Sequence, residues 1–142
     1  MEDLKDIVIN EIKKLKFGKD IKLDIRRYEE VYPESEEQED SYLIQIRIGS
    51  QKDDSTHDTT CSYLDFWYNP KEKVLDHINL RLIENLRNRD LGRGLVKSLE
   101  DIGKGLNCHK VKIYINTNKE FWNHMGYADR GDHWEKELNL NN

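Results

Sequence analysis

The sequence has few cysteines, few prolines and no excess of basic residues. Its 142 residues include two cysteines and two prolines, and 23 Lys+Arg stand against 28 Asp+Glu, for a formal net charge of −5. A chain without a basic excess lacks the electrostatic signature of a nucleic-acid-binding protein, so nucleic acid is not an expected partner. Cys61 and Cys108 form no CxxC pair. This predicts two reduced thiols without a chemical role.

Long hydrophobic runs are also missing. No stretch approaches the roughly 18 to 20 consecutive apolar residues that a membrane helix needs. The chain opens on Met1, Glu2 and Asp3, where a signal peptide would place basic residues before an apolar run. We therefore expect neither membrane insertion nor secretion, and a cytoplasmic location. Hydrophobic residues make up 36% of the 142 residues, in short patterned segments, which favours one folded domain with a polar surface.

The hydrophobic pattern of the first half predicts one helix followed by strands. Leu4, Val8 and Ile12 recur at helical spacing in a segment that reaches Gly18. Residues 34–40 contain five acids among seven residues and should form a solvated loop. Around this loop, alternating apolar and polar residues predict strands over residues 21–28, 42–48, 61–68 and 74–83. The last three are expected to form an antiparallel meander.

In the second half, helices and strands alternate. Apolar residues between Leu91 and Leu106 have helical spacing and predict a helix of about four turns. Further segments predict a strand over residues 110–115, a short helix over 116–125 and a final strand over 133–138. This order predicts an α/β fold with a mixed, largely antiparallel sheet of about six strands.

The most informative motif lies between a predicted strand and a predicted helix. It has the pattern RxxGxG and consists of Arg89, Asp90, Leu91, Gly92, Arg93 and Gly94. The first turn of a helix has backbone N–H groups without intrahelical partners, and glycine lets a ligand approach the backbone closely. The helix dipole adds ~0.3 to 1 kcal/mol for an anion at this end. The motif therefore predicts an anion-binding turn; the alternative is a helix start that binds nothing.

This motif and the segments after it resemble the GCN5-related N-acetyltransferase (GNAT) family. In that family an RxxGxG loop holds the pyrophosphate of acetyl-CoA, and a helix of the type FYxxxGF follows the next strand. Here the segment at residues 121–127 reads FWNHMGY. The resemblance covers residues 74–138, whereas residues 1–60 are similar only in being rich in strands. It implies one GNAT-like domain over residues 1–142, with helices on both faces of the sheet and an acetyl-CoA-binding half at residues 74–138.

The resemblance also implies a function. It implies an N-acetyltransferase that moves an acetyl group from acetyl-CoA to a primary amine of a small molecule or protein, by direct attack in a ternary complex. The pantetheine would pass between the strand ending near Glu84 and the strand ending near Asn116. The residues implied to bind acetyl-CoA are Leu82, Glu84, Arg89, Asp90, Leu91, Gly92, Arg93, Gly94, Asn116 and Phe121.

One catalytic position departs from the family pattern. The family often has a tyrosine where this sequence has Trp122, and that tyrosine protonates the departing CoA sulfur. An indole N–H cannot donate a proton at neutral pH. Tyr127 is the substitute that we assign as a catalytic residue, with Tyr114 as the other tyrosine available. A catalytically silent CoA-binding or protein-interaction module with a GNAT-like fold is therefore the alternative function.

The acceptor amine must lose a proton before it attacks the thioester, so a base is needed. Asp76, His77 and Glu84 lie on or beside the strand that would flank the thioester. We choose Glu84 as the catalytic base because strand ends open into clefts, and strict alternation places Asp76 and His77 on opposite faces.

The sequence also bears on several further classes of site and partner. A Rossmann dinucleotide site is disfavoured because the third glycine of GxGxxG is missing. The histidines have no metal-ligand spacing, so no metal is expected. The acidic residues 34–40 would attract a cationic acceptor such as a polyamine or a lysine-bearing protein. The sequence is compatible with a homodimer.

Overall fold

The structure is a computed structural model that describes residues 2–14, 21–37, 39–49, 61–81, 91–114 and 118–138. The helices within these ranges are α1 (Glu2–Lys13), α2 (Tyr28–Val31), α3 (Leu91–Gly105) and α4 (Lys119–His124). The strands are β1 (Ile21–Arg27), β2 (Tyr42–Gly49), β3 (Cys61–Asn69), β4 (Val74–Arg81), β5 (Lys110–Ile113), β6 (Ala128–Asp129) and β7 (Trp134–Glu137). None of the helices in these ranges is both long enough and apolar enough to cross a membrane.

All seven strands form one sheet in the order β1-β2-β3-β4-β5-β7-β6. Every pair of neighbours is antiparallel except β4 and β5, which run parallel. A parallel pair needs a crossover connection, and α3 lies in the segment that joins these two strands. The predicted mixed, largely antiparallel sheet is confirmed. The strand beyond the predicted six is β6, whose two residues are too few to carry a hydrophobic pattern.

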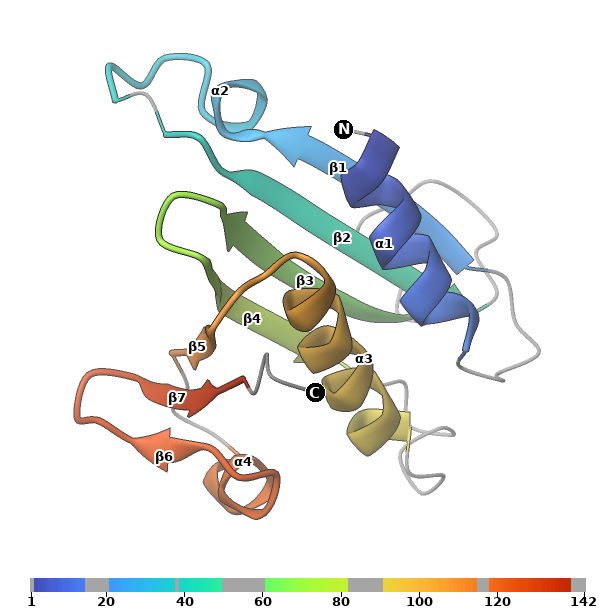
Figure 1. The fold of residues 1–142 in the computed structure, drawn as a ribbon, viewed down its shortest axis with the longest axis vertical. Helices are drawn as coiled ribbons and strands as arrows, with labels where there is room; N and C mark the ends of the chain where they lie inside the picture. Colours follow the sequence, from blue (N-terminus) through green and yellow to red (C-terminus); the bar gives the residue numbers. More distant parts are fainter. Residues whose placement is uncertain are drawn as a thin grey trace.

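The core lies between one face of the sheet and the helices α1 and α3 (Figure 1). Every second side chain of β2 points into it: Ile44, Ile46 and Ile48 are fully buried. From α3, Leu95, Leu99 and Ile102 are also fully buried, at the spacing of one helix face. Burying each such side chain contributes about 1.5 to 3 kcal/mol. The inward-facing side chains of β2 and of α3 therefore belong to the same hydrophobic core.

A glycine brings α3 close to the sheet. A Cβ atom at Gly103 would lie 2.7 Å from Leu138 Cδ1 and 3.2 Å from Leu75 Cδ1. Leu75 belongs to β4, so the absence of a side chain at Gly103 sets how closely α3 packs on the strand that precedes it. This fixes the helix relative to β4.

The opposite face of the sheet carries polar and aromatic side chains. In β3, Ser62, Leu64 and Phe66 are buried, and the residues between them alternate to the other face. Trp67 projects from that face, and the rings of Tyr28 and Tyr32 pack against it. Because Tyr28 opens α2, this short helix lies on the face that α1 and α3 do not cover. Helices therefore lie on both faces of the sheet.

Strand β4 contains a β-bulge. The register pairs Asp65 with Asn79 and Trp67 with Asp76, so Phe66 of β3 faces two residues of β4, His77 and Ile78. His77 has a positive φ of 52°, a backbone conformation in which histidine is found more often than most residues. Bulges bend a strand, change the direction of a side chain and occur frequently beside active sites.

Candidate active site

The sheet opens at the bulge. The parallel strands β4 and β5 are paired only at Val74 with Lys110 and at Leu75 with Val111. Beyond these residues β4 continues to Arg81 and β5 to Ile113 without further pairing between their described parts. The two neighbours therefore separate from Asp76 onward, where the bulge begins. Space between two parallel strands, with backbone groups on both sides, suits an extended ligand.

The first turn of α3 carries the described part of the RxxGxG motif. Gly92 is buried, Gly94 is half-buried and Arg93 is exposed. No acidic residue lies in this turn, so nothing in it repels an anion at the positive end of the helix. Leu91 begins the helix. The predicted residues Leu82, Glu84, Arg89, Asp90 and Asn116 lie outside the described residues.

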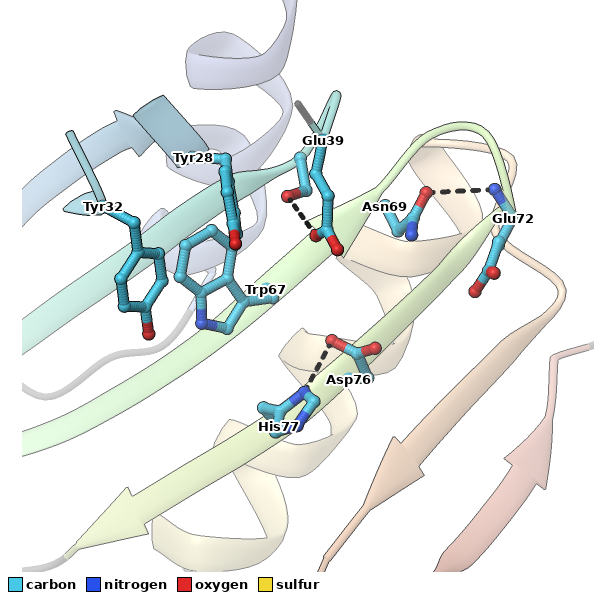
Figure 2. A pocket seen from close by; sticks show the side chains of 9 residues that line it. Tyr28, Tyr32, Glu39, Trp67, Asn69, Glu72, Asp76 and His77 are labelled. Carbon is cyan, nitrogen blue, oxygen red and sulfur yellow. Dashed lines mark hydrogen bonds and ion pairs between the residues drawn. The ribbon is translucent and has the colours of Figure 1, made fainter. Parts of the chain in front are cut away.

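A cavity of 390 Å³ lies on the polar face of the sheet (Figure 2). It extends from the aromatic rings of α2 and β3 to the bulge of β4. The residues that line it are Tyr28, Tyr32, Glu39, Ser41, Trp67, Asn69, Glu72, Asp76 and His77. Its volume lies near the lower end of the range of small-molecule sites, which is about 300 to 1,000 Å³. This pocket meets the opening between β4 and β5 at Asp76 and His77.

Asp76 and His77 form a contact pair at the end of the pocket. The Nδ1 atom of His77 lies 3.1 Å from Oδ1 of Asp76. The expectation that the two side chains lie on opposite faces is wrong, because the bulge adds one residue and interrupts the alternation. A carboxylate at Nδ1 favours the tautomer with its proton on that nitrogen, which leaves Nε2 as the basic atom. The pair is thus arranged to accept a proton at His77.

Tyr114 crosses the opening between the two strands. It follows β5 directly, and its ring stacks on that of His77 of β4, with the centroids 4.6 Å apart. Burial raises the pKa of the Tyr114 hydroxyl, and the nearby charge of Asp76 adds to this shift. The phenol therefore keeps its proton, and it can serve as a hydrogen-bond donor beside the histidine.

Tyr127, the tyrosine predicted to be catalytic, lies elsewhere. It is 1% exposed, and its hydroxyl donates to Oε2 of Glu100 in α3 at 3.0 Å. Burial raises the pKa of Tyr127, and the charge of Glu100 raises it further. Trp122 packs against this ring at a centroid distance of 5.2 Å, and Phe121 packs on Trp122 at 5.1 Å. Neither Tyr127 nor Phe121 is among the residues that line the pocket, and their functional roles stay predictions.

Cys108 is fully buried, and burial raises the pKa of its thiol to about 12. At neutral pH this thiol carries its proton, which makes it a poor nucleophile.

His133 is held between two carboxylates near Tyr114. Its Nδ1 lies 2.6 Å from Asp132 Oδ1, and its Nε2 lies 2.7 Å from Glu135 Oε1. The hydrogen bond to Glu135, followed by that to Asp132, raises the pKa of His133. The same contact lowers the pKa of Glu135. Through these two contacts His133 links β7 to the turn before it.

This arrangement gives a pH-dependent contribution to stability. A raised histidine pKa stabilises the fold below the unfolded value and loses this effect as the pH rises through the folded value. A lowered glutamate pKa loses its effect as the pH falls. The penalty of His133→Asn in urea unfolding is therefore expected to be largest between roughly pH 4.5 and 6.5, and smaller near pH 8.5. Equal penalties at both pH values contradict this, and His109→Asn, at an exposed histidine, is the control.

The sequence analysis missed the aromatic wall of the pocket. Trp67 lies in a segment rich in strand-forming residues, where a tryptophan is ordinary. Tyr28 and Tyr32 are four residues apart, the spacing of one helix face. That spacing is the one signal in the sequence that could have indicated the aromatic wall. It was overlooked because the strand pattern of residues 21–28 runs into the start of α2.

No protein-family model matches the chain. No curated protein matches it either. Among solved structures, GCN5 from Tetrahymena is similar over 97% of this chain and 86% of its own, with a TM-score of 0.54 and 13% identity. A protein from Klebsiella pneumoniae assigned as an acyl-CoA N-acyltransferase is similar over 68% of this chain and 73% of its own, with a TM-score of 0.51 and 16% identity. At this identity the comparisons show the fold alone: the chain has the GNAT fold.

Proposed function

We propose that the chain uses this GNAT fold as an acyl-CoA-dependent N-acetyltransferase, which moves an acetyl group from acetyl-CoA to a primary amine. The observation that carries the proposal is the separation of the parallel strands β4 and β5 at the bulge of β4. The pocket of 390 Å³ meets this opening at Asp76 and His77. In the proposal the opening connects the turn at the start of α3, which would bind the diphosphate, with this cavity, which would take the acceptor.

In this proposal the acyl donor lies between β4 and β5. Its diphosphate is held by the unpaired backbone N–H groups of the first turn of α3, at Gly92 and Arg93, and by the charge of Arg93, and the absence of a side chain at Gly92 and Gly94 lets the phosphates approach. The residues taken from the sequence complete the donor site: Leu82, Glu84, Arg89, Asp90, Leu91, Asn116 and Phe121. The thioester is directed toward the bulge. There the amine approaches from the pocket.

The transfer needs one base and one acid. An ammonium group loses its proton to the base, and the neutral amine attacks the thioester carbonyl. A C–N bond forms, the C–S bond breaks, the nitrogen releases its second proton, and the CoA thiolate takes up a proton. We assign the role of base to His77, because the Asp76 carboxylate at its Nδ1 orients the ring. Tyr114 lies beside it as a proton donor, while Glu84 and Tyr127 are the alternatives from the sequence.

The alternative function is a module that binds CoA without turnover. Trp122 favours it, because it stands where the GNAT family often has the tyrosine that acts as the acid. The two functions differ in one assay. With acetyl-CoA and a panel of primary amines, an enzyme releases free CoA thiol, whereas a binding module gives only a rise in thermal stability.

Gly92→Val tests the donor site. We expect it to weaken acetyl-CoA binding by about tenfold or more, close to 1.4 kcal/mol, because the branched side chain crowds the diphosphate. Titration calorimetry measures the affinity, and Gly94→Ala provides a milder second variant. Lys104→Val, at an exposed position in the last turn of α3, places the same side chain in the helix far from the proposed diphosphate site and should leave the affinity unchanged. If folded Gly92→Val bound acetyl-CoA with unchanged affinity, the diphosphate would not lie at this turn. If the native chain gave no heat on titration with acetyl-CoA, donor binding itself would be refuted.

A further inference from the structure

We propose that the pocket binds a second cationic group of the acceptor, so that the acceptor is a linear aliphatic diamine or polyamine. This rests on the proposed function of the same site and deepens it. One amino group of the acceptor lies next to His77 and receives the acetyl group. The other, as an ammonium, is held at the aromatic end of the pocket.

The aromatic end consists of three rings. The ring centroids of Tyr32 and Trp67 are 6.1 Å apart, with planes only 15° from parallel. Tyr28 is tilted against both, at 5.1 Å from Tyr32 and 6.0 Å from Trp67. All three line the pocket, and Tyr32 is 51% exposed. Electron-rich ring faces attract organic cations, most strongly at tryptophan.

The charge of the pocket has one sign. Glu39, Glu72 and Asp76 line it, and none of its described lining residues is Lys or Arg. Elsewhere on the same face the acid Asp65 is paired with Arg47 at 2.6 Å. Asp65 thus has a basic partner, whereas the described residues that line the pocket include no Lys or Arg to balance its three carboxylates. Residues 34, 36, 37 and 40, all acidic and exposed, add to the negative potential next to Glu39.

The two ends of the pocket are close enough for one small molecule. Trp67 and Asp76 are direct partners across β3 and β4. In Figure 2 the three rings gather at one end, Asp76 and His77 lie at the other, and the carboxylate of Glu39 lies beside Tyr28 and Trp67. A short aliphatic chain with an amino group at each end matches this arrangement. The volume of 390 Å³ favours such a molecule over a folded protein surface.

The test compares 1,5-diaminopentane with n-pentylamine, which has the same chain and lacks the second ammonium. Release of free CoA from acetyl-CoA gives kcat/KM for each. We expect the diamine to be favoured by about tenfold or more at low salt, and less at high salt. In Trp67→Leu and in Glu39→Gln the ratio should fall toward one. Tyr63→Leu, on the same strand and outside the pocket, should keep the ratio.

Each outcome decides something. If both amines are acetylated equally well, or a lysine-containing peptide is much preferred to every diamine and polyamine, the inference is wrong and the proposed function stands. If acetyl-CoA binds and no amine releases CoA, the proposed enzyme function fails. In that case calorimetric titration with 1,5-diaminopentane still tests the pocket, since binding that is lost in Glu39→Gln supports the cation site and absence of binding overturns it.

Discussion

His77→Asn is expected to lower kcat for amine acetylation by about 10²- to 10⁴-fold, the usual contribution of a general base. Asparagine tolerates the positive φ of 52° at this position, so the bulge should persist. The imidazole Nε2 is lost, and the amine then has no partner beside Asp76 that accepts its proton. Steady-state release of CoA measures kcat, and calorimetry measures the affinity for acetyl-CoA, which should stay within about twofold.

Two controls accompany this variant. His124→Asn, at an exposed histidine in α4, should leave kcat unchanged. Asp76→Asn should lower kcat less than His77→Asn, because it removes the group that orients the imidazole rather than the basic nitrogen itself. A full rate in His77→Asn would exclude His77 as the base and return that role to Glu84.

Phe66→Ala is expected to lower the free energy of unfolding by about 3 to 5 kcal/mol. The side chain of Phe66 is fully buried, and in the strand register Phe66 lies opposite the two bulge residues of β4. Removing the ring leaves a cavity beneath the point where the bulge changes the strand's direction. Because total stabilities are about 5 to 15 kcal/mol, this is a large share. Urea unfolding followed by fluorescence or circular dichroism gives the midpoint and slope.

The same measurement on two other variants tests the reason for the loss. Phe66→Leu keeps most of the buried volume and should cost clearly less. Phe121→Ala removes a half-buried ring of α4 and should also cost less. A loss below about 1 kcal/mol for Phe66→Ala would show that the region collapses around the missing ring.

The regular elements were predictable because their side chains alternate between core and solvent. Ile44, Ile46 and Ile48 specify β2, and the helical spacing from Leu95 to Ile102 specifies the inner face of α3. The helix α2 was hidden because its four residues are too few for a period and directly follow β1. The bulge could not be predicted because the alternation rule assumes that each residue of a strand pairs with one residue of its neighbour. Here one residue of β3 lies opposite two residues of β4, and only the pairing of the two strands reveals this.

The candidate site shows the same limit. The RxxGxG motif is local and could be read directly, although residues 82–90 lie outside the described ranges. The pocket depends on contacts between distant segments: Tyr32 and Trp67 are brought together by the folding of α2 onto β3. Asp76 and His77 were recognised as candidate groups, and their pairing required the bulge.

The order of the strands has a consequence for self-association. It leaves β1 at one edge of the sheet and the two-residue β6 at the other. Lys22, Asp24 and Arg26 are exposed along β1, and charged side chains on an outer strand oppose the addition of a further strand. At the other edge, β6 is too short to template one. Within the described part of the chain, the two edges of the sheet therefore disfavour pairing with a second copy, and we expect such a copy to dock through a helix or loop surface.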